Sequence, residues 1–216
     1  MLNKAVTASF DVDAQKCFTY RCPEELPVKG GEDIAPALNK QATYAKYRVG
    51  SKDCHSPASL WVDTDKNPQF TPIPGYENLD IRWKVHGVPG TPGFNLIDGL
   101  PKIPDYDFFV WKGMELDMHP YGACYHDLAD SKSTGVIEWL RAQGVKNVIV
   151  GGIASDFCVR KTVLQLRAAK FEVVVNIEAC RGIWATTTEE EQIVEFRKAG
   201  CIVIRSTAEL ELLVET

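Results

Sequence analysis

The sequence predicts an α/β fold in which a parallel sheet lies between two layers of helices. Six short apolar runs resemble strands that are buried on both faces, and helical patterns separate most of them. Strands that alternate with helices form parallel sheets, because each helix packs against a face of the sheet as it connects two strands. We therefore expect a three-layer α/β/α fold with a six-stranded parallel sheet flanked by helices.

The expected elements follow one another along the chain at short intervals. A helix at 32–43 precedes the second strand, and a helix at 133–143 ends at Gly144, since glycine suits the position after a helix end. Val159, Val163 and Leu166 recur at helical spacing within 157–170, and a helix at 187–200 opens with acidic residues. The six expected strands are 5–12, 46–50, 106–111, 147–153, 172–177 and 201–204.

Residues 56–104 do not follow this alternation. They hold eight of the twelve prolines and several glycines, which disfavour helix interiors and central strands. A loop of this length inside a compact domain is usually functional. We expect one domain over residues 1–216, with a long and partly irregular insertion at about 56–104.

Composition and charge exclude several classes of protein. A net charge of −5 without a basic stripe argues against a nucleic-acid partner, and no apolar run is long enough to cross a membrane. The first ten residues are too polar for a signal peptide. Seven cysteines cannot all pair within one chain. We therefore expect reduced thiols in the cytoplasm, and the sequence leaves a homo-oligomer open.

Ionisable residues follow four of the expected strands. Asp13 follows the first, Asp53 and His55 the second, Lys112 the third and Cys158 the fourth. In open α/β sheets the ligand crevice lies beyond the carboxyl ends of the strands. Each residue alone is weak support for a site, but an acid, a lysine and a cysteine at one edge predict a catalytic centre.

The stretch NVIVGGIASDFC, residues 147–158, delivers Cys158 where a helix should begin. Peptide N–H groups at a helix start favour an anion, so we expect a lowered pKa for this thiol and a site that could stabilise an oxyanion. An isolated cysteine is more often a small core residue. Together with Asp13 as general base and Lys112 beside it, Cys158 is the expected nucleophile.

Asp53 and His55 are two residues apart, which places both side chains on one side of an extended segment. A carboxylate and an imidazole suit a divalent metal such as zinc, iron or manganese. His86, in the insertion, is the best candidate for a third ligand, and three protein ligands leave positions open for water and substrate. His119 and His126 are set aside as non-ligands.

Five segments of the chain resemble the nicotinamidase (pyrazinamidase) branch of the isochorismatase-like cysteine hydrolases. The segment GGIASDFCVRKT is similar to the family's nucleophile motif, and VDAQKCF resembles its opening motif. KDCHSP and WKVHGVPGTPG look like its metal-binding segments, and WKG carries its lysine. GGIASDFCVRKT is residues 151–162, VDAQKCF is 12–18, KDCHSP is 52–57, WKVHGVPGTPG is 83–93 and WKG is 111–113.

This resemblance implies a six-stranded parallel sheet and a catalytic triad of Asp13, Lys112 and Cys158. It also implies a cis peptide between Ile153 and Ala154, with the Ala154 and Cys158 N–H groups forming an oxyanion hole.

The resemblance places aromatic walls for the substrate ring at Phe18, Trp83 and Tyr121. It assigns one divalent metal ion to Asp53, His55 and His86, with zinc expected and iron or manganese as alternatives.

Two residues depart from the family pattern in the first metal segment. Cys54 stands where the family usually has tryptophan, and Ser59 stands where many members have a second histidine. The second departure favours Asp53, His55 and His86 plus waters over four protein ligands.

The activity that the resemblance implies is hydrolysis of the linear amide nicotinamide to nicotinate and ammonia. The reaction would proceed through a cysteine thioester intermediate and would serve NAD salvage. Pyrazinamide would be a second small-molecule substrate. One alternative is a metal-free amidohydrolase of the same superfamily that acts on N-carbamoyl amides. Another is a non-enzymatic thiol redox protein.

Overall fold

A computed structural model describes residues 2–214 of the chain. Its six strands form one sheet in the order β3-β2-β1-β4-β5-β6, and every pair of neighbours is parallel. The predicted six-stranded parallel sheet is confirmed. The strands are β1 (Thr7–Val12), β2 (Tyr47–Asp53), β3 (Phe108–Lys112), β4 (Asn147–Ile153), β5 (Glu172–Arg181) and β6 (Ile202–Ile204).

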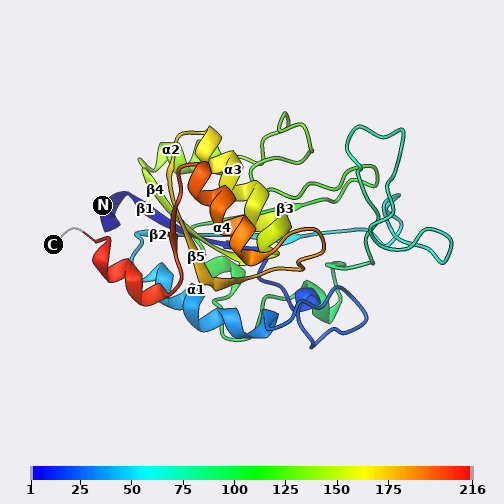
Figure 1. The fold of residues 1–216 in the computed structure, drawn as a ribbon, viewed down its shortest axis with the longest axis horizontal. Coiled ribbons are helices and arrows are strands. Elements are labelled where there is room, and N and C mark those ends of the chain that lie inside the picture. Colours follow the sequence, from blue (N-terminus) through cyan, green and yellow to red (C-terminus); the bar gives the residue numbers. More distant parts are fainter. Residues whose placement is uncertain (1, 215–216) are drawn as a thin grey trace.

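Helices cover both faces of the sheet, as the sequence predicts (Figure 1). Three helices pack on one face and share its core with apolar side chains of the strands. The fourth packs on the opposite face, against a second apolar cluster. The first three are α2 (Val136–Ala142), α3 (Arg160–Ala168) and α4 (Glu189–Lys198), and the fourth is α1 (Ala35–Ala42).

Several elements differ from the expected bounds at residues that carry charge. β2 extends through Asp53 and β3 through Lys112, so both residues end a strand instead of following it. The two strands pair in register at Asp53 and Lys112, which are both buried. A charged residue in a sequence argues against a buried strand. In the structure, however, each of these two side chains has a partner of opposite charge inside the protein.

Other differences are local. The expected helix at 32–43 divides into a short helical turn, η3 (Gly31–Ile34), and α1, which has a proline in its first turn. β5 runs four residues further than expected, to Arg181. The sequence did not predict the terminal helical turn η7 (Thr207–Leu212).

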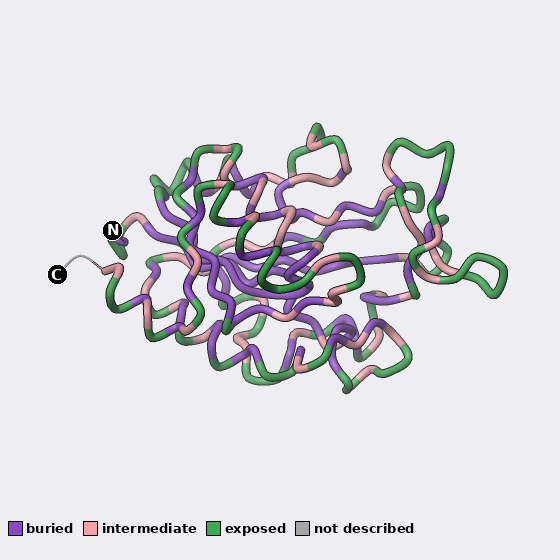
Figure 2. Tube along the Cα trace, in the orientation of Figure 1, coloured by how far each residue is buried: buried purple, intermediate pink, exposed green. Residues whose placement is uncertain are grey.

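The strand order reverses between β1 and β4, the two central strands. From β1 the chain winds outward through β2 and β3, and from β4 it winds in the other direction through β5 and β6. Figure 2 shows these strands buried across the middle of the molecule. A crevice forms at such a reversal because the loops from adjacent strands leave in opposite directions. The fold therefore directs the chain after β1 and β4 to one point.

The segment between β2 and β3 is irregular in the structure. Apart from isolated bridges, its regular structure is confined to two short helical turns, η4 (Pro92–Phe94) and η5 (Ile103–Asp105). In Figure 1 much of this segment extends beyond the ends of the strands. No helix in the described part of the chain is long and apolar enough to cross a membrane.

Candidate active site

Lys112 lies at the centre of the site, at the end of β3. Its ammonium is fully buried. It donates a hydrogen bond to Asp53 Oδ1 and another to the Pro120 carbonyl at 3.1 Å, and it lies 3.1 Å from Asp13 Oδ2. The Cys158 sulfur is 3.7 Å from Nζ. Burial lowers the pKa of Lys112, but Asp13 and Asp53 outweigh it and hold the pKa well above its ordinary value. The lysine therefore stays charged.

Asp13 follows β1 and turns its carboxylate toward this lysine. Its backbone has φ = 45°, a left-handed conformation that aspartate tolerates better than most residues. Ser51 donates a hydrogen bond to Asp13 Oδ1 at 2.6 Å. Burial raises the pKa of Asp13 to about 6, against the opposing effect of Lys112. A carboxylate with that pKa is well matched to accept a proton near neutral pH.

Cys158 lies in a wide helical turn, Ser155–Val159, that leads directly into α3. Its sulfur lies within 4.8 Å of carboxylate oxygens of Asp13 and Asp53. The pKa of the thiol is well above its usual value, because burial favours the neutral form and the carboxylates reinforce it, although Lys112 opposes them. The expected lowering of this pKa by the helix start is therefore wrong for this site. The proton stays on sulfur, and a base must remove it.

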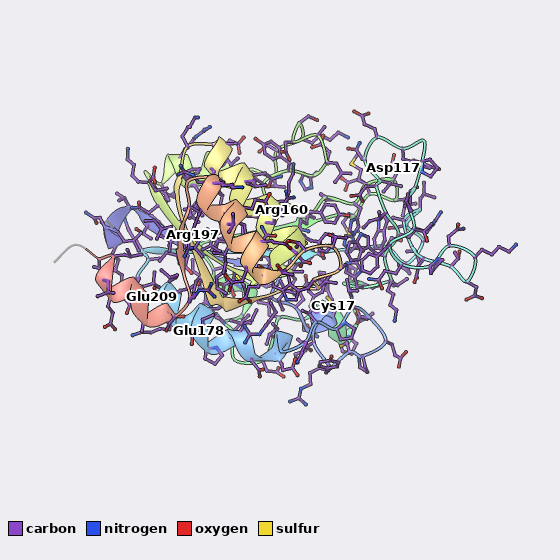
Figure 3. All side chains as sticks on the ribbon, viewed as in Figure 1. Cys17, Asp117, Arg160, Glu178, Arg197 and Glu209 are labelled. Atoms are coloured by element: carbon purple, nitrogen blue, oxygen red, sulfur yellow. The ribbon has the colours of Figure 1, made fainter. Side chains whose placement is uncertain are left out.

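The helix that follows Cys158 is tied to its neighbour. Arg160, the first residue of α3, projects toward α4, where its guanidinium donates two-pronged hydrogen bonds to Glu195 (Figure 3). The pair is partly exposed, so its contribution to stability is small.

The peptide bond between Ile153 and Ala154 is cis, as the resemblance implied. Ala154 and Cys158 both line the cavity described below. Their assignment as the oxyanion hole stays a prediction.

His55 and His86 lie beside Asp53 in matching arrangements. The Nδ1–H of His55 donates to the Gly113 carbonyl at 2.9 Å, and that of His86 donates to the Lys84 carbonyl at 2.7 Å. Because a carbonyl can only accept, these bonds leave a lone pair on each Nε2. The two Nε2 atoms lie 3.4 and 3.6 Å from the oxygens of Asp53.

This arrangement fits a bound cation. Two imidazole lone pairs face a carboxylate, so acceptors are opposed to acceptors with no proton between them. His55 Nε2 has no hydrogen-bond partner within the described residues. Burial would raise the pKa of Asp53, but Lys112 lowers it well below its usual range, so the carboxylate is ionised. One carboxylate and two imidazoles are ligands that suit zinc, iron or manganese.

Sequence reasoning missed two residues that position these groups. Gln15 is buried and makes a double hydrogen bond with the backbone of Asp53, at 2.9 and 2.7 Å. Ser51 holds Asp13 from the neighbouring strand. Gln15 lies inside the VDAQKCF motif, so its signal was present, whereas Ser51 carries no distinguishing pattern.

Sequence reasoning also set aside His119, which the structure places at the site. His55, His86 and His119 each offer a ring nitrogen, and these atoms lie within 4.8 Å of one another. The available signal was position, since His119 follows β3 and so leaves the same edge of the sheet as Lys112. His126, the other histidine set aside, is outside this group.

A narrow cavity opens onto these residues. Its walls include the three aromatic residues expected from the sequence, Phe18, Trp83 and Tyr121, and one that was missed, Phe157. Trp83 donates a hydrogen bond to the Tyr121 hydroxyl at 3.2 Å, and that hydroxyl donates to Asp80 at 2.8 Å. The polar residues on the wall are Asp53, His86, His119 and Cys158.

Both residues that depart from the family pattern are buried. The Cys54 thiol donates to the Met114 sulfur at 2.9 Å. The Ser59 hydroxyl has no hydrogen-bond partner within residues 2–214.

Comparison with known proteins assigns the chain to a family. A family model described as the isochorismatase domain matches residues 8–208, so the chain belongs to the isochorismatase family. Within it, the chain is 31% identical to a nicotinamidase/pyrazinamidase of Mycobacterium tuberculosis, over 76% of this chain and 81% of that protein.

Two solved structures share the fold and carry related names. A nicotinamidase and pyrazinamidase of Acinetobacter baumanii is 25% identical, with a TM-score of 0.86 over 95% of this chain and 98% of the other. A pyrazinamidase of Pyrococcus horikoshii in complex with zinc is also 25% identical, with a TM-score of 0.72 over 93% and 99%.

The electrostatics of the site predict how Cys158 reacts with an alkylating agent. Burial holds the thiol pKa well above its usual value, so a base must remove the proton, and Asp13→Asn should slow alkylation of Cys158 by iodoacetamide severalfold at pH 7.5. Mass spectrometry of peptides measures the rate at each cysteine. Half-buried Cys22 serves as the internal control. Alkylation of Cys158 at the parent rate or faster in the variant would contradict this description.

Proposed function

We propose that the protein is a nicotinamidase, which hydrolyses nicotinamide to nicotinate and ammonia. The observation that carries the proposal is the convergence of Asp13, Lys112 and Cys158 at the reversal point of the sheet, beside a small cavity with aromatic walls. Relatives named nicotinamidase or pyrazinamidase, over most of this chain, support the same activity.

The chemistry begins with Asp13, which takes the thiol proton as the Cys158 sulfur attacks the carboxamide carbon. A carbon–sulfur bond forms, and the carbonyl electron pair moves to oxygen. Asp13 then delivers its proton to the amide nitrogen, the carbon–nitrogen bond breaks, and ammonia leaves a nicotinoyl thioester on Cys158. Asp13 next takes a proton from water, whose oxygen attacks the thioester. Nicotinate leaves and the thiol is restored.

Lys112 and the backbone stabilise the charges that form along this route. The ammonium at 3.7 Å from sulfur offsets the negative charge of the thiolate, which burial would otherwise disfavour. The Ala154 and Cys158 N–H groups would receive the oxyanion, since both residues line the cavity.

Asp53, His55 and His86 would hold one divalent metal ion beside the substrate. When bound, the ion supplies a Lewis acid for the nitrogen of the pyridine ring. We propose zinc, with iron or manganese as alternatives, because imidazole and carboxylate ligands suit these ions. The zinc complex of the Pyrococcus horikoshii pyrazinamidase supports the choice.

Phe18, Trp83 and Tyr121 would enclose the ring of the substrate. Trp83 meets Phe157 edge to face at 4.8 Å and is held by Tyr121, so its ring plane is fixed before a ligand enters. Aromatic walls suit a flat ring, and pyrazinamide presents the same carboxamide on a ring of the same size, so pyrazinamide should also be a substrate.

The same proposal gives the protein a place in NAD salvage in the cytoplasm. All seven cysteines are free, as expected in a reducing compartment. We propose that residues 1–216 act as one hydrolase domain.

The nucleophile is tested by ammonia release from nicotinamide. Cys158→Ala should reduce the rate to the background of the assay, because no other group in the mechanism forms the acyl intermediate. Cys22→Ala, which changes a half-buried cysteine outside the site, should keep the parent rate. Full activity in Cys158→Ala would rule out the mechanism.

The pKa of Asp13 predicts the pH dependence. Since Asp13 must be ionised to accept the thiol proton and its pKa is about 6, kcat/KM should fall below pH 6 by about tenfold per pH unit. The assay is run with saturating metal, and circular dichroism checks that the protein stays folded. A kcat/KM that is flat down to pH 5 would exclude Asp13 as a base with this pKa.

A further inference from the structure

The environment of His119 differs from that of any other histidine at the site. Its side chain is buried, and neither ring nitrogen has a hydrogen-bond partner within the described residues. His55 and His86, in contrast, each donate Nδ1–H to a backbone carbonyl. A buried polar atom without a partner costs about 1–3 kcal/mol, so two on one ring indicate a ligand that satisfies at least one.

The ring of His119 is held rigidly among aromatic neighbours. It stacks on His55 at 5.1 Å with 25° between the planes, and on Trp83 at 5.9 Å with 20°. Trp61 packs against it edge to face at 4.5 Å. A neutral imidazole in this position offers the lone pair of one ring nitrogen.

The distances allow one ion to reach all three imidazoles. The ligand nitrogens of His55, His86 and His119 lie within 4.8 Å of one another. Two nitrogens bound to one tetrahedral zinc ion at about 2.1 Å are about 3.4 Å apart, so the three nitrogens need to close by at most about 1.4 Å.

We propose that His119 is a fourth protein ligand of the metal, together with Asp53, His55 and His86. This inference rests on the metal site of the proposed function, and it replaces the three-ligand site expected from the sequence. The loop after β3 would thereby supply the imidazole that the segment around Ser59 lacks.

The test measures metal binding rather than activity. The metal-free full-length protein is titrated with Co²⁺ in competition with a chromogenic chelator, and the visible absorption of bound Co²⁺ is recorded. His119→Phe keeps a flat ring between Trp61 and Trp83 but removes both nitrogens. We expect one Co²⁺ per parent chain, at least about tenfold weaker affinity in the variant, and a changed Co²⁺ spectrum.

His126→Phe is the matched control, because it removes another histidine that lies outside the group, and it should bind Co²⁺ as the parent does. Thermal unfolding of the metal-free proteins checks the fold. If His119→Phe does not fold, His119→Asn, whose side chain is smaller than that of histidine, replaces it. Parent affinity and an unchanged spectrum in the His119 variant would overturn the inference, as would a parent protein that binds no Co²⁺.

Ammonia release from nicotinamide separates this inference from the proposed function. If the parent protein hydrolyses nicotinamide and His119→Phe binds metal normally, the proposed function stands and His119 is not a ligand. If the parent protein releases no ammonia and the variant loses Co²⁺ binding, His119 stands as a metal ligand and the proposed function is overturned.

Discussion

The structure depends on the buried ammonium of Lys112. An unpaired charge in a protein interior is very costly, so a lysine without solvent exposure requires partners of opposite charge on several sides. Asp13 comes from the end of β1 and Asp53 from the end of β2. The carbonyl of Pro120, in the loop after β3, accepts a further hydrogen bond from the ammonium. The lysine thus fixes the carboxyl ends of three strands around Cys158, which follows β4. The two carboxylates in turn keep the lysine charged.

The site has an ionic half and a neutral half that meet at Asp53. On one side, Lys112 pairs with Asp53 and favours its ionised form. On the other, backbone carbonyls select the tautomers of His55 and His86 and turn their lone pairs toward the same carboxylate. Residues without chemistry of their own maintain this arrangement. Gly113 has φ = 84°, and a Cβ there would clash with the His55 ring, so only glycine allows its carbonyl to hold His55.

The sequence was sufficient to predict the sheet and the convergence of Asp13, Lys112 and Cys158, because strands buried on both faces form apolar runs and parallel strands share one carboxyl edge. It did not predict that Asp53 and Lys112 belong to strands, because a single charged residue after an apolar run indicates that the strand has ended. The raised pKa of Cys158 depends on complete burial, which no local pattern encodes. His119 was missed because its approach to His55 depends on the path of the loop after β3, and neither periodicity nor spacing specifies that path.

The role of Lys112 is tested most directly by ammonia release from nicotinamide in Lys112→Met, a variant of similar length without charge. The account predicts a loss of at least about 100-fold, because the thiolate and the two carboxylates lose their shared cation. Lys52→Met is the control, since Lys52 is also buried but lies over the Phe94 ring, away from the triad. Circular dichroism must show that both variants fold. A folded Lys112→Met protein that releases ammonia at the parent rate would contradict the central claim.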